Sequence, residues 1–325
     1  MIFFDTLDLN YCHDTKVGIL KEGAKQMEGD IVQATRSIIF VATKEDANAV
    51  ATFLNSRKTG ITAYPFYSSL GDASGDSPSG GAARTREDTL ELWQASKNKV
   101  LIATTLGTHG LNFNDVDYVG HLTVRADIRT FYQEVNRAGR AGQGGRSVQA
   151  IHPLLFQDAS WMVDDWGNGR LVSAFRGMLR IIAAEDTCRR CIILHTLGSI
   201  QPIKGTCAKC AVCAKEDARY APERPLVDVT RTCCRIIFEL SANMKKKVEN
   251  PFVKALAAFW KWPHIPLAEV NACFVHLCAS GVIDFKQGKG QAAYLALVVN
   301  NEAAAPIISR ERPVLLRVTE VPLVV

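Results

Sequence analysis

The chain has 325 residues, of which 47% are hydrophobic and 22% charged, so its length allows two or three domains and its composition predicts a buried core. Its net charge of +5 permits binding to nucleic acid without requiring it. No apolar run is as long as a membrane span and the N-terminus lacks the basic start of a secretory signal, which excludes membrane-spanning and secreted proteins.

The first half of the chain alternates between apolar, β-rich runs and amphipathic helical segments. The predicted strands cover residues 38–42, 61–66, 100–104, 116–122 and 147–152, and the predicted helices cover 45–55, 84–96 and the segment before residue 137. Strand, helix and strand within one short segment form a βαβ unit, which requires a parallel sheet. The pattern therefore predicts an α/β lobe with a parallel sheet, whose ligands are expected at the loops that follow the strands.

The pattern changes after Pro153. Residues 159–185 predict helices, a cysteine-rich segment follows, and a linker at 215–226 contains two prolines. From Val227 onward short helices lead into strand, Gly-Lys-Gly turn and strand, which is typical of a β-hairpin. We expect a small helical domain and then an α+β domain.

Two arginines stand three residues apart in the segment FYQEVNRAGRAGQGG, which covers Phe131 to Gly145. Arg137 and Arg140 follow Gln133, which lies on a predicted helix. Arginine is always charged and presents a planar set of donors, which suits the γ-phosphate of a nucleotide in a phosphoryl-transfer reaction. The alternative is an ordinary basic loop.

A glycine-bearing loop follows the predicted strand at 100–104. It covers Ala103 to Asn112 and offers backbone amides and the hydroxyls of Thr104, Thr105 and Thr108 to phosphate groups. An ordinary strand-to-helix turn is the alternative.

Five of the ten cysteines lie between Cys188 and Cys213. Two residues separate Cys207 from Cys210 and Cys210 from Cys213, a spacing that lets thiolates bind one ion from the same side. With Cys188 as the fourth ligand they predict a closed, structural zinc site, although Cys191 stays open as an alternative to Cys188. For the other cysteines we expect core packing.

Lysines gather at two further places. Lys245, Lys246 and Lys247 form a short run, and Lys289 lies in the predicted hairpin turn. Each is a candidate contact to nucleic-acid phosphates, and solvated surface lysines are the alternative. The sequence has no G-x-x-x-x-G-K-[ST] phosphate loop and no acidic Mg²⁺ strand end, so we expect no ATP site within this chain alone.

The order of these motifs resembles the RecQ family of ATP-dependent 3'-5' DNA helicases. The resemblance covers about residues 37–215 and rests on the strand IIFVAT, the loop ATTLGTHGLN, the segment QEVNRAGRAG and the cysteine spacing after CRR. It implies that Arg137 and Arg140 reach ATP and that Gln133 opens their motif. It also implies that four cysteines bind zinc and that a loop couples nucleotide state to single-stranded DNA through Thr104, Thr105, Thr108, Gly110 and Asn112.

The resemblance also predicts the domain plan. Residues 1–153 are expected to be a second RecA-like motor lobe with a lead-in at 1–35. A helical hairpin and zinc-binding domain at 154–222 and a winged-helix-like domain at 223–325 would follow. Asn136 and Ala141 depart from the arginine motif, because the family has glycine and aspartate there.

A first motor lobe, with its ATP and Mg²⁺ site, is expected from another polypeptide or another part of the gene. The implied function is the unwinding of DNA in repair and recombination. The implied partners are single-stranded DNA and duplex junctions, and the implied location is the nucleus in a eukaryote or otherwise the cytoplasm. The alternatives are a non-enzymatic DNA-binding module and a decayed helicase copy.

Overall fold

The computed structural model describes residues 2–9, 15–70, 85–95, 97–105, 116–139, 144–158, 169–184, 187–198, 207, 210–213, 226–245, 250–287 and 295–317. These residues fall into two compact units. The sheet unit comprises residues 1–7, 14–123 and 131–150, and the helical unit comprises 8–13, 124–130 and 151–325. The predicted boundary within the second half, between residues 222 and 223, stays a prediction.

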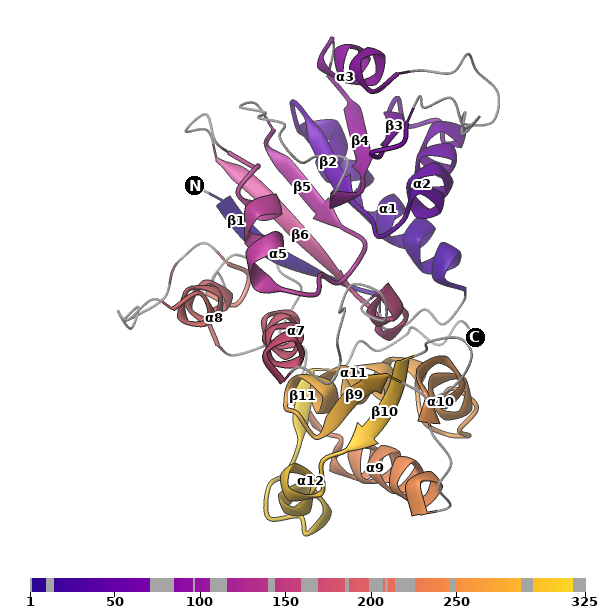
Figure 1. The fold of residues 1–325 in the computed structure, drawn as a ribbon, viewed down its shortest axis with the longest axis vertical. Helices are drawn as coiled ribbons and strands as arrows, with labels where there is room; N and C mark the ends of the chain where they lie inside the picture. The colour runs from indigo at the N-terminus through magenta and orange to yellow at the C-terminus, as the bar shows by residue number, and fades with distance from the viewer. Residues whose placement is uncertain are drawn as a thin grey trace. The chain divides into compact units, whose positions relative to one another are not determined.

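A six-stranded sheet forms the centre of the sheet unit (Figure 1). Its strand order is β1-β6-β5-β2-β4-β3, and the pairings of β6 with β5, β5 with β2, β2 with β4 and β4 with β3 are all parallel. The strands are β1 (Ile2–Asp8), β2 (Ser37–Phe40), β3 (Thr62–Phe66), β4 (Lys99–Ala103), β5 (Tyr118–His121) and β6 (Gly145–Ile151). The α/β class and the parallel sheet are as predicted. The apolar runs of the sequence indicated this sheet, because strands that helices cover on both faces are apolar throughout.

Threonine N-caps begin two of the helices that connect these strands. Thr43 caps α2 (Lys44–Ser56) and Thr85 caps α3 (Arg86–Gln94), each in a capping box with the aspartate three residues later. Each threonine hydroxyl accepts a hydrogen bond from an amide that the helix itself leaves unpaired. α5 (Ile128–Val135) comes directly before the arginine segment.

The expected lead-in at 1–35 contains two regular elements, β1 and α1 (Lys16–Gln33). Three glycines in α1 lower its intrinsic helix propensity, so local pattern alone gives a weak helix signal. Tertiary packing decides the outcome: α1 contacts α2, and its buried side chains include Ile19, Leu20 and Met27.

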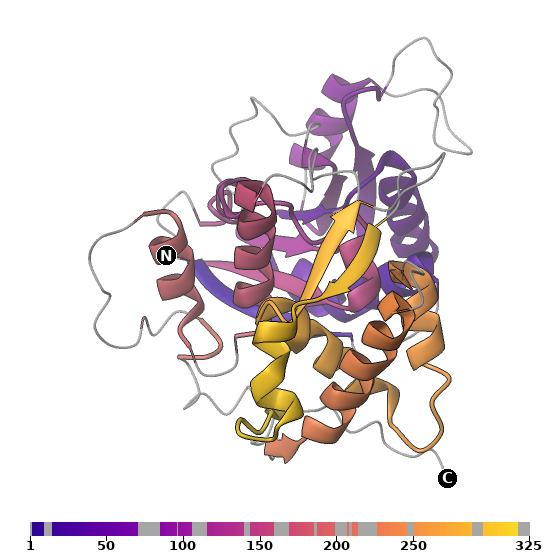
Figure 2. The ribbon, with the colours of Figure 1, turned by 60° about the horizontal axis from the view of Figure 1, so that its bottom comes forward.

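The helical unit contains a three-stranded antiparallel sheet with the order β8-β10-β9 (Figures 1 and 2). β9 and β10 pair antiparallel, as the predicted hairpin requires, and the winged-helix-like domain stays a prediction. The elements of the unit are η1 (Pro153–Asp158), α7 (Gly169–Ile182), α8 (Arg189–Thr196), β7 (Leu226–Asp228), α9 (Thr230–Lys245), β8 (Asn250–Pro251), α10 (Phe252–Phe259), α11 (Leu267–Ala279), β9 (Ile283–Gln287), β10 (Leu295–Val299), α12 (Asn301–Ile308) and β11 (Leu315–Arg317).

Aromatic side chains build the core of this unit. The rings of Phe252 and Phe274 have centroids 5.8 Å apart, and Phe175 meets Phe285 at 5.4 Å with the rings nearly perpendicular. α11 is central, because α7, α9 and β9 all contact it. Among the helices that the structure describes, none combines the length and apolar character needed to cross a membrane.

Candidate functional site

The carboxyl ends of the parallel strands form one edge of the sheet unit. Backbone hydrogen bonds continue the strand pairing there: the amide of Val41 donates to the carbonyl of Ala103 at 3.0 Å, and the amide of Leu122 donates to that of Phe40 at 2.8 Å. The loops that begin at this edge are therefore fixed at their start by the sheet. This is the edge at which open α/β sheets bind ligands.

A buried hydrogen-bonded group joins three elements at this edge. Glu134 on α5 accepts a hydrogen bond from the hydroxyl of Thr105 at 2.8 Å, and its second carboxylate oxygen lies 3.1 Å from Nε2 of His121. His121 ends β5 and is fully buried, and Glu134 is 2% exposed. The imidazole stacks on Phe40 with ring centroids 5.3 Å apart and also meets Phe131. We call Thr105, His121 and Glu134 the polar triad.

The polar triad connects two segments that the sequence singled out. Thr105 is the third residue of the predicted coupling loop, and Glu134 lies three residues before Arg137. A carboxylate inside an apolar unit is stable only if its oxygens are hydrogen-bonded, and both oxygens of Glu134 have a partner. Displacing Thr105 would therefore remove a hydrogen bond from Glu134 and disturb α5.

Arg137 lies in a turn that follows α5. The amide of Gly139 donates to the carbonyl of Val116 at 2.7 Å, and Gly139 has a φ of +69°, which glycine adopts without strain. Gly145 lies against the same turn: a Cβ added there would lie 2.7 Å from the nitrogen of Gly139 and 2.8 Å from the carbonyl carbon of Ala138. The hydrogen bond to Val116 and the close packing of Gly145 therefore fix the turn from two sides.

The remaining predicted residues of this edge are only partly described. Gln133 is exposed on α5, and Thr104 is half-buried beside Thr105, with its amide bonded to the carbonyl of Phe66 at 3.1 Å. Several predicted positions lie outside the described residues, namely Arg140, Thr108, Gly110 and Asn112.

The cysteines at 188, 207, 210 and 213 lie together in the helical unit, with all four Sγ atoms within 4.8 Å of one another. The Sγ atoms of Cys188 and Cys210 are 3.9 Å apart, which matches the separation of about 3.8 Å expected for tetrahedral thiolates at about 2.3 Å from zinc. Cys188 immediately precedes α8, and a turn joins Cys210 to Cys213 through a backbone hydrogen bond of 2.9 Å. The donor set fits one zinc ion.

The protonation of the thiols separates Cys188 from Cys191. Burial opposes ionisation of Cys188, but hydrogen bonds from Cys191, Cys207 and Cys213 together lower the pKa of its thiol to about 6. Burial, the hydrogen bond to Cys188 and neighbouring thiolate charge raise the pKa of Cys191 to about 11. The pKa of the Cys213 thiol is raised as well, so position rather than charge favours Cys188 as the ligand, because Cys188 and not Cys191 belongs to the group of four clustered Sγ atoms.

The predicted lysine contacts are mostly outside the described residues. Lys245 is the last residue of α9, while Lys246, Lys247 and Lys289 lie outside. Three of the cysteines expected to pack in a core are fully buried, namely Cys233, Cys273 and Cys278, whereas Cys234 is only half-buried.

His121 and Glu134 were not among the predicted site residues. A signal for Glu134 was present, because Phe131, Glu134, Val135 and Ala138 share one helical face and all are buried. An acidic residue in an otherwise apolar stripe indicates a buried partner. For His121 the signal was its place at the end of an apolar strand.

Comparison with known proteins shows what the sheet unit is similar to. A family model described as "Helicase conserved C-terminal domain" matches residues 24–142. The human "Probable ATP-dependent RNA helicase DDX4" is 28% identical over 210 residues, which is 58% of this chain and 27% of that protein. The Drosophila melanogaster "ATP-dependent RNA helicase vasa" is 29% identical over 121 residues, which is 37% of this chain and 16% of that protein.

Among solved structures, "Mss116p DEAD-box helicase domain 2 bound to an RNA duplex" is 12% identical and covers 85% of each chain, with a TM-score of 0.38. That score is too low to support an argument, so the family model and the strand order carry the assignment. The chain spans about a quarter or less of the length of the curated relatives it matches. Residues 24–142, which make up most of the sheet unit, are therefore similar to the helicase conserved C-terminal domain.

Proposed function

We propose that the sheet unit is the second motor lobe of an ATP-driven nucleic-acid helicase. In this proposal Arg137 and Arg140 contact the γ-phosphate of an ATP molecule that a first motor lobe holds. The observation that carries it is the turn at residues 136–139, held between Val116 and Gly145 directly after Glu134. A guanidinium group on such a fixed turn meets the charge that grows during phosphoryl transfer with little reorganisation.

The polar triad supplies the coupling in this proposal. Thr105 lies near the start of the loop that would meet nucleic-acid phosphates, and its hydrogen bond to Glu134 links this loop to α5, the helix that precedes the arginines. A strand of nucleic acid that shifts the loop changes this hydrogen bond and thereby the placement of Arg137. ATP hydrolysis and movement along the strand are linked through one buried carboxylate.

We further propose that the helicase is of the RecQ kind and acts on DNA. The helicase family model ends at residue 142, so it does not cover the cysteines on which the RecQ resemblance partly rests. The RecQ resemblance implies a four-thiolate zinc site after the motor lobe, and the four clustered cysteines fit such a site. Zinc would fix the connection between α8 and the segment at 207–213 and would take no part in the reaction.

An RNA helicase is the second candidate. It is supported by the names of the curated relatives, which are RNA helicases that match part of this chain at 28–29% identity. The motor lobe by itself does not separate the two candidates, because helicases that act on either nucleic acid share its motifs.

The motor proposal is tested by supplying a first lobe. The full chain is combined with the first motor lobe of a RecQ-like helicase, and ATP hydrolysis is measured with and without single-stranded DNA. We expect no hydrolysis by the chain alone and DNA-stimulated hydrolysis by the pair. Arg137→Ala should lower kcat about 10³-fold, as for other arginines that contact the transferring phosphate.

Arg129 provides the matched control, because it is an exposed arginine on the same helix. Arg129→Ala should leave kcat unchanged. Hydrolysis at the unmutated rate by the Arg137→Ala variant would contradict the proposed role. Replacing the DNA by RNA of the same sequence decides between the two candidates, since the RecQ-like reading requires stronger stimulation by DNA.

A further inference from the structure

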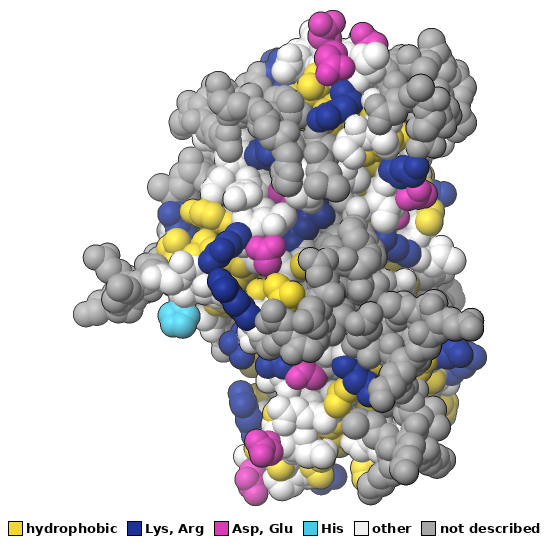
Figure 3. Space-filling view, viewed as in Figure 1, with side chains coloured by type: hydrophobic (Ala, Val, Ile, Leu, Met, Phe, Trp, Pro, Cys, Tyr) yellow, Lys and Arg dark blue, Asp and Glu magenta, His cyan; other side chains and the backbone are white. Residues whose placement is uncertain are grey.

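The positive charge of the chain is concentrated in one segment of the helical unit. Residues 230–264, which cover α9 and α10, contain seven Lys and Arg residues and two Glu residues. The chain totals are 38 and 33, so the rest of the protein has 31 residues of each sign and no net charge. On the face drawn in Figure 3, basic side chains lie at several separate places, with acidic and uncharged side chains between them.

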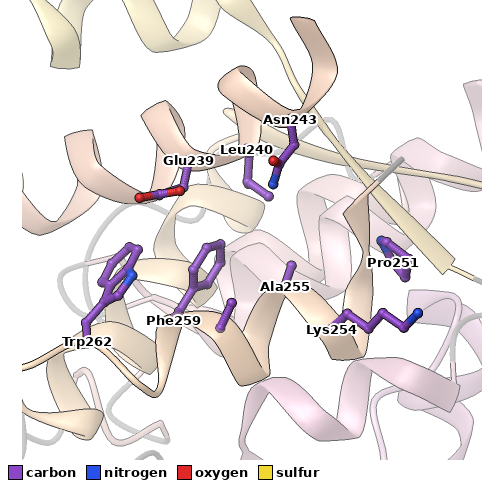
Figure 4. Close-up of a pocket in the computed structure, with 9 residues that line it drawn as sticks. Glu239, Leu240, Asn243, Pro251, Lys254, Ala255, Phe259 and Trp262 are labelled. Carbon is purple, nitrogen blue, oxygen red and sulfur yellow. The ribbon is translucent and has the colours of Figure 1, made fainter. Parts of the chain in front are cut away.

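A pocket of about 150 Å³ lies between α9 and α10. Figure 4 shows Glu239 and Asn243 on α9 facing Phe259 and Trp262 on the other side, with Lys254 at one end. The rings of Phe259 and Trp262 are 5.0 Å apart and form an aromatic wall. The pocket thus combines an aromatic wall, an amide, a carboxylate and a cation.

A second cation stands at the aromatic end. The guanidinium of Arg235 lies over the ring of Trp262, 4.2 Å from its centroid, in a cation–π contact. Lys254 at the opposite end is exposed. An elongated anion crossing the pocket would therefore meet a positive charge on either side of the aromatic wall.

α11 offers no comparable surface. Nine of its thirteen residues are buried, including Val270, Phe274 and Leu277, and none of the thirteen is exposed. α11 is therefore not available as a helix that enters the groove of a duplex. α9 and α10 have exposed polar and basic side chains, and the pocket lies between them.

We propose that this pocket binds an unpaired base of single-stranded nucleic acid. The base packs against the half-buried ring of Trp262, which the buried Phe259 supports, and such aromatic contact is tolerant of sequence. Asn243 and Glu239 provide hydrogen-bonding groups for the edge of the base. Lys254 and Arg235 meet the phosphates on its two sides. All the residues of this site belong to the helical unit, and binding there needs no ATP.

The test measures binding of the full chain without ATP, by tryptophan fluorescence. The probes are a short thymidine homopolymer, the same backbone with abasic positions, and poly-glutamate. We expect the thymidine probe to bind at least about fivefold more tightly than the abasic probe, because only the former has a base to insert. Trp262→Ala and Asn243→Ala should each reduce this difference.

Lys254→Ala should weaken both nucleic-acid probes and lower the salt dependence of binding by about one counterion. Its matched control is Lys21→Ala, which removes an exposed lysine from α1 and should change neither quantity. Asn243 is exposed, so its variant keeps the test valid if Trp262→Ala does not fold. Equal binding of thymidine and abasic probes, or equally tight binding of poly-glutamate, overturns the proposal.

The inference shares only the nucleic-acid partner with the proposed function. A chain that loses base-dependent binding on Trp262→Ala but fails to hydrolyse ATP with any first lobe would keep the pocket and refute the motor. The converse result would refute the pocket alone.

Discussion

The sheet unit and the cysteine segment, residues 187–213, differ in how many buried apolar side chains surround their polar groups. In the sheet unit the polar triad is enclosed by a large apolar core, to which β2 and β5 contribute only buried residues. The buried apolar residues described in the cysteine segment are Ile193, Cys210 and Val212. Apolar burial therefore stabilises the sheet unit, whereas the cysteine segment buries few apolar side chains and would need another source of stability, such as a metal ion bound by its clustered thiols.

The largest effect is expected from breaking the thiolate group. If zinc holds this segment, Cys210→Ser should reduce bound zinc from one ion per chain to well below one and unfold the segment, since structural zinc contributes on the order of 10 kcal/mol. Metal analysis and thermal unfolding measure this. Cys191→Ser is the control and should retain zinc, because Cys191 is not in the clustered group. Full zinc content in the Cys210→Ser variant would refute the site.

A smaller effect is expected where the arginine turn meets β6. Gly145→Ala places a Cβ within 2.7 Å of backbone, which does not yield as a flexible side chain does, so the sheet unit should lose about 1–3 kcal/mol of stability. Chemical denaturation followed by circular dichroism measures the change. Gly29→Ala on α1 has no atom within 4 Å and should stabilise the unit by about 0.5–1 kcal/mol. The comparison fails if Gly145→Ala and Gly29→Ala change the free energy of unfolding in the same direction.

Glu134→Gln tests whether the polar triad is more than a structural contact. Glutamine accepts the hydrogen bond from Thr105 but loses the charged partner of His121, so stability should fall by about 1–2 kcal/mol. With a first lobe present, stimulation of ATP hydrolysis by nucleic acid should fall more than the basal rate. Glu87→Gln, an exposed carboxylate on α3, is the control. An unchanged ratio of stimulated to basal rate would leave the triad a purely structural role.

The smallest effect is expected from pH, in the helical unit. Burial, with a further contribution from the charge of Arg312, lowers the pKa of His276 below its usual value. The unfolded chain then binds this proton more readily, so the unit loses stability as the pH falls below about 6.5. His276→Gln should make Tm less dependent on pH between neutral and mildly acidic conditions, by about a degree or two. An identical pH dependence in both proteins would contradict this assignment.

Much of the sheet unit was predictable from local pattern. The strand at 38–42, the helix at 45–55 and the strand at 61–66 were expected from hydrophobic periodicity, and the structure has β2, α2 and β3 there. α1 and β1 were not expected, because glycines weaken the helical signal and only packing against α2 and the sheet stabilises these elements.

The sequence by itself determined the apolar strands, the twin arginines and the spacing of the cysteines, because each depends on residues that are near one another along the chain. Only the tertiary structure decided that Glu134 meets Thr105 and His121, that Cys188 rather than Cys191 joins the thiolate group, and that a pocket forms between α9 and α10. These contacts join segments far apart in sequence, and local periodicity contains no information about which distant side chains a buried polar group will meet.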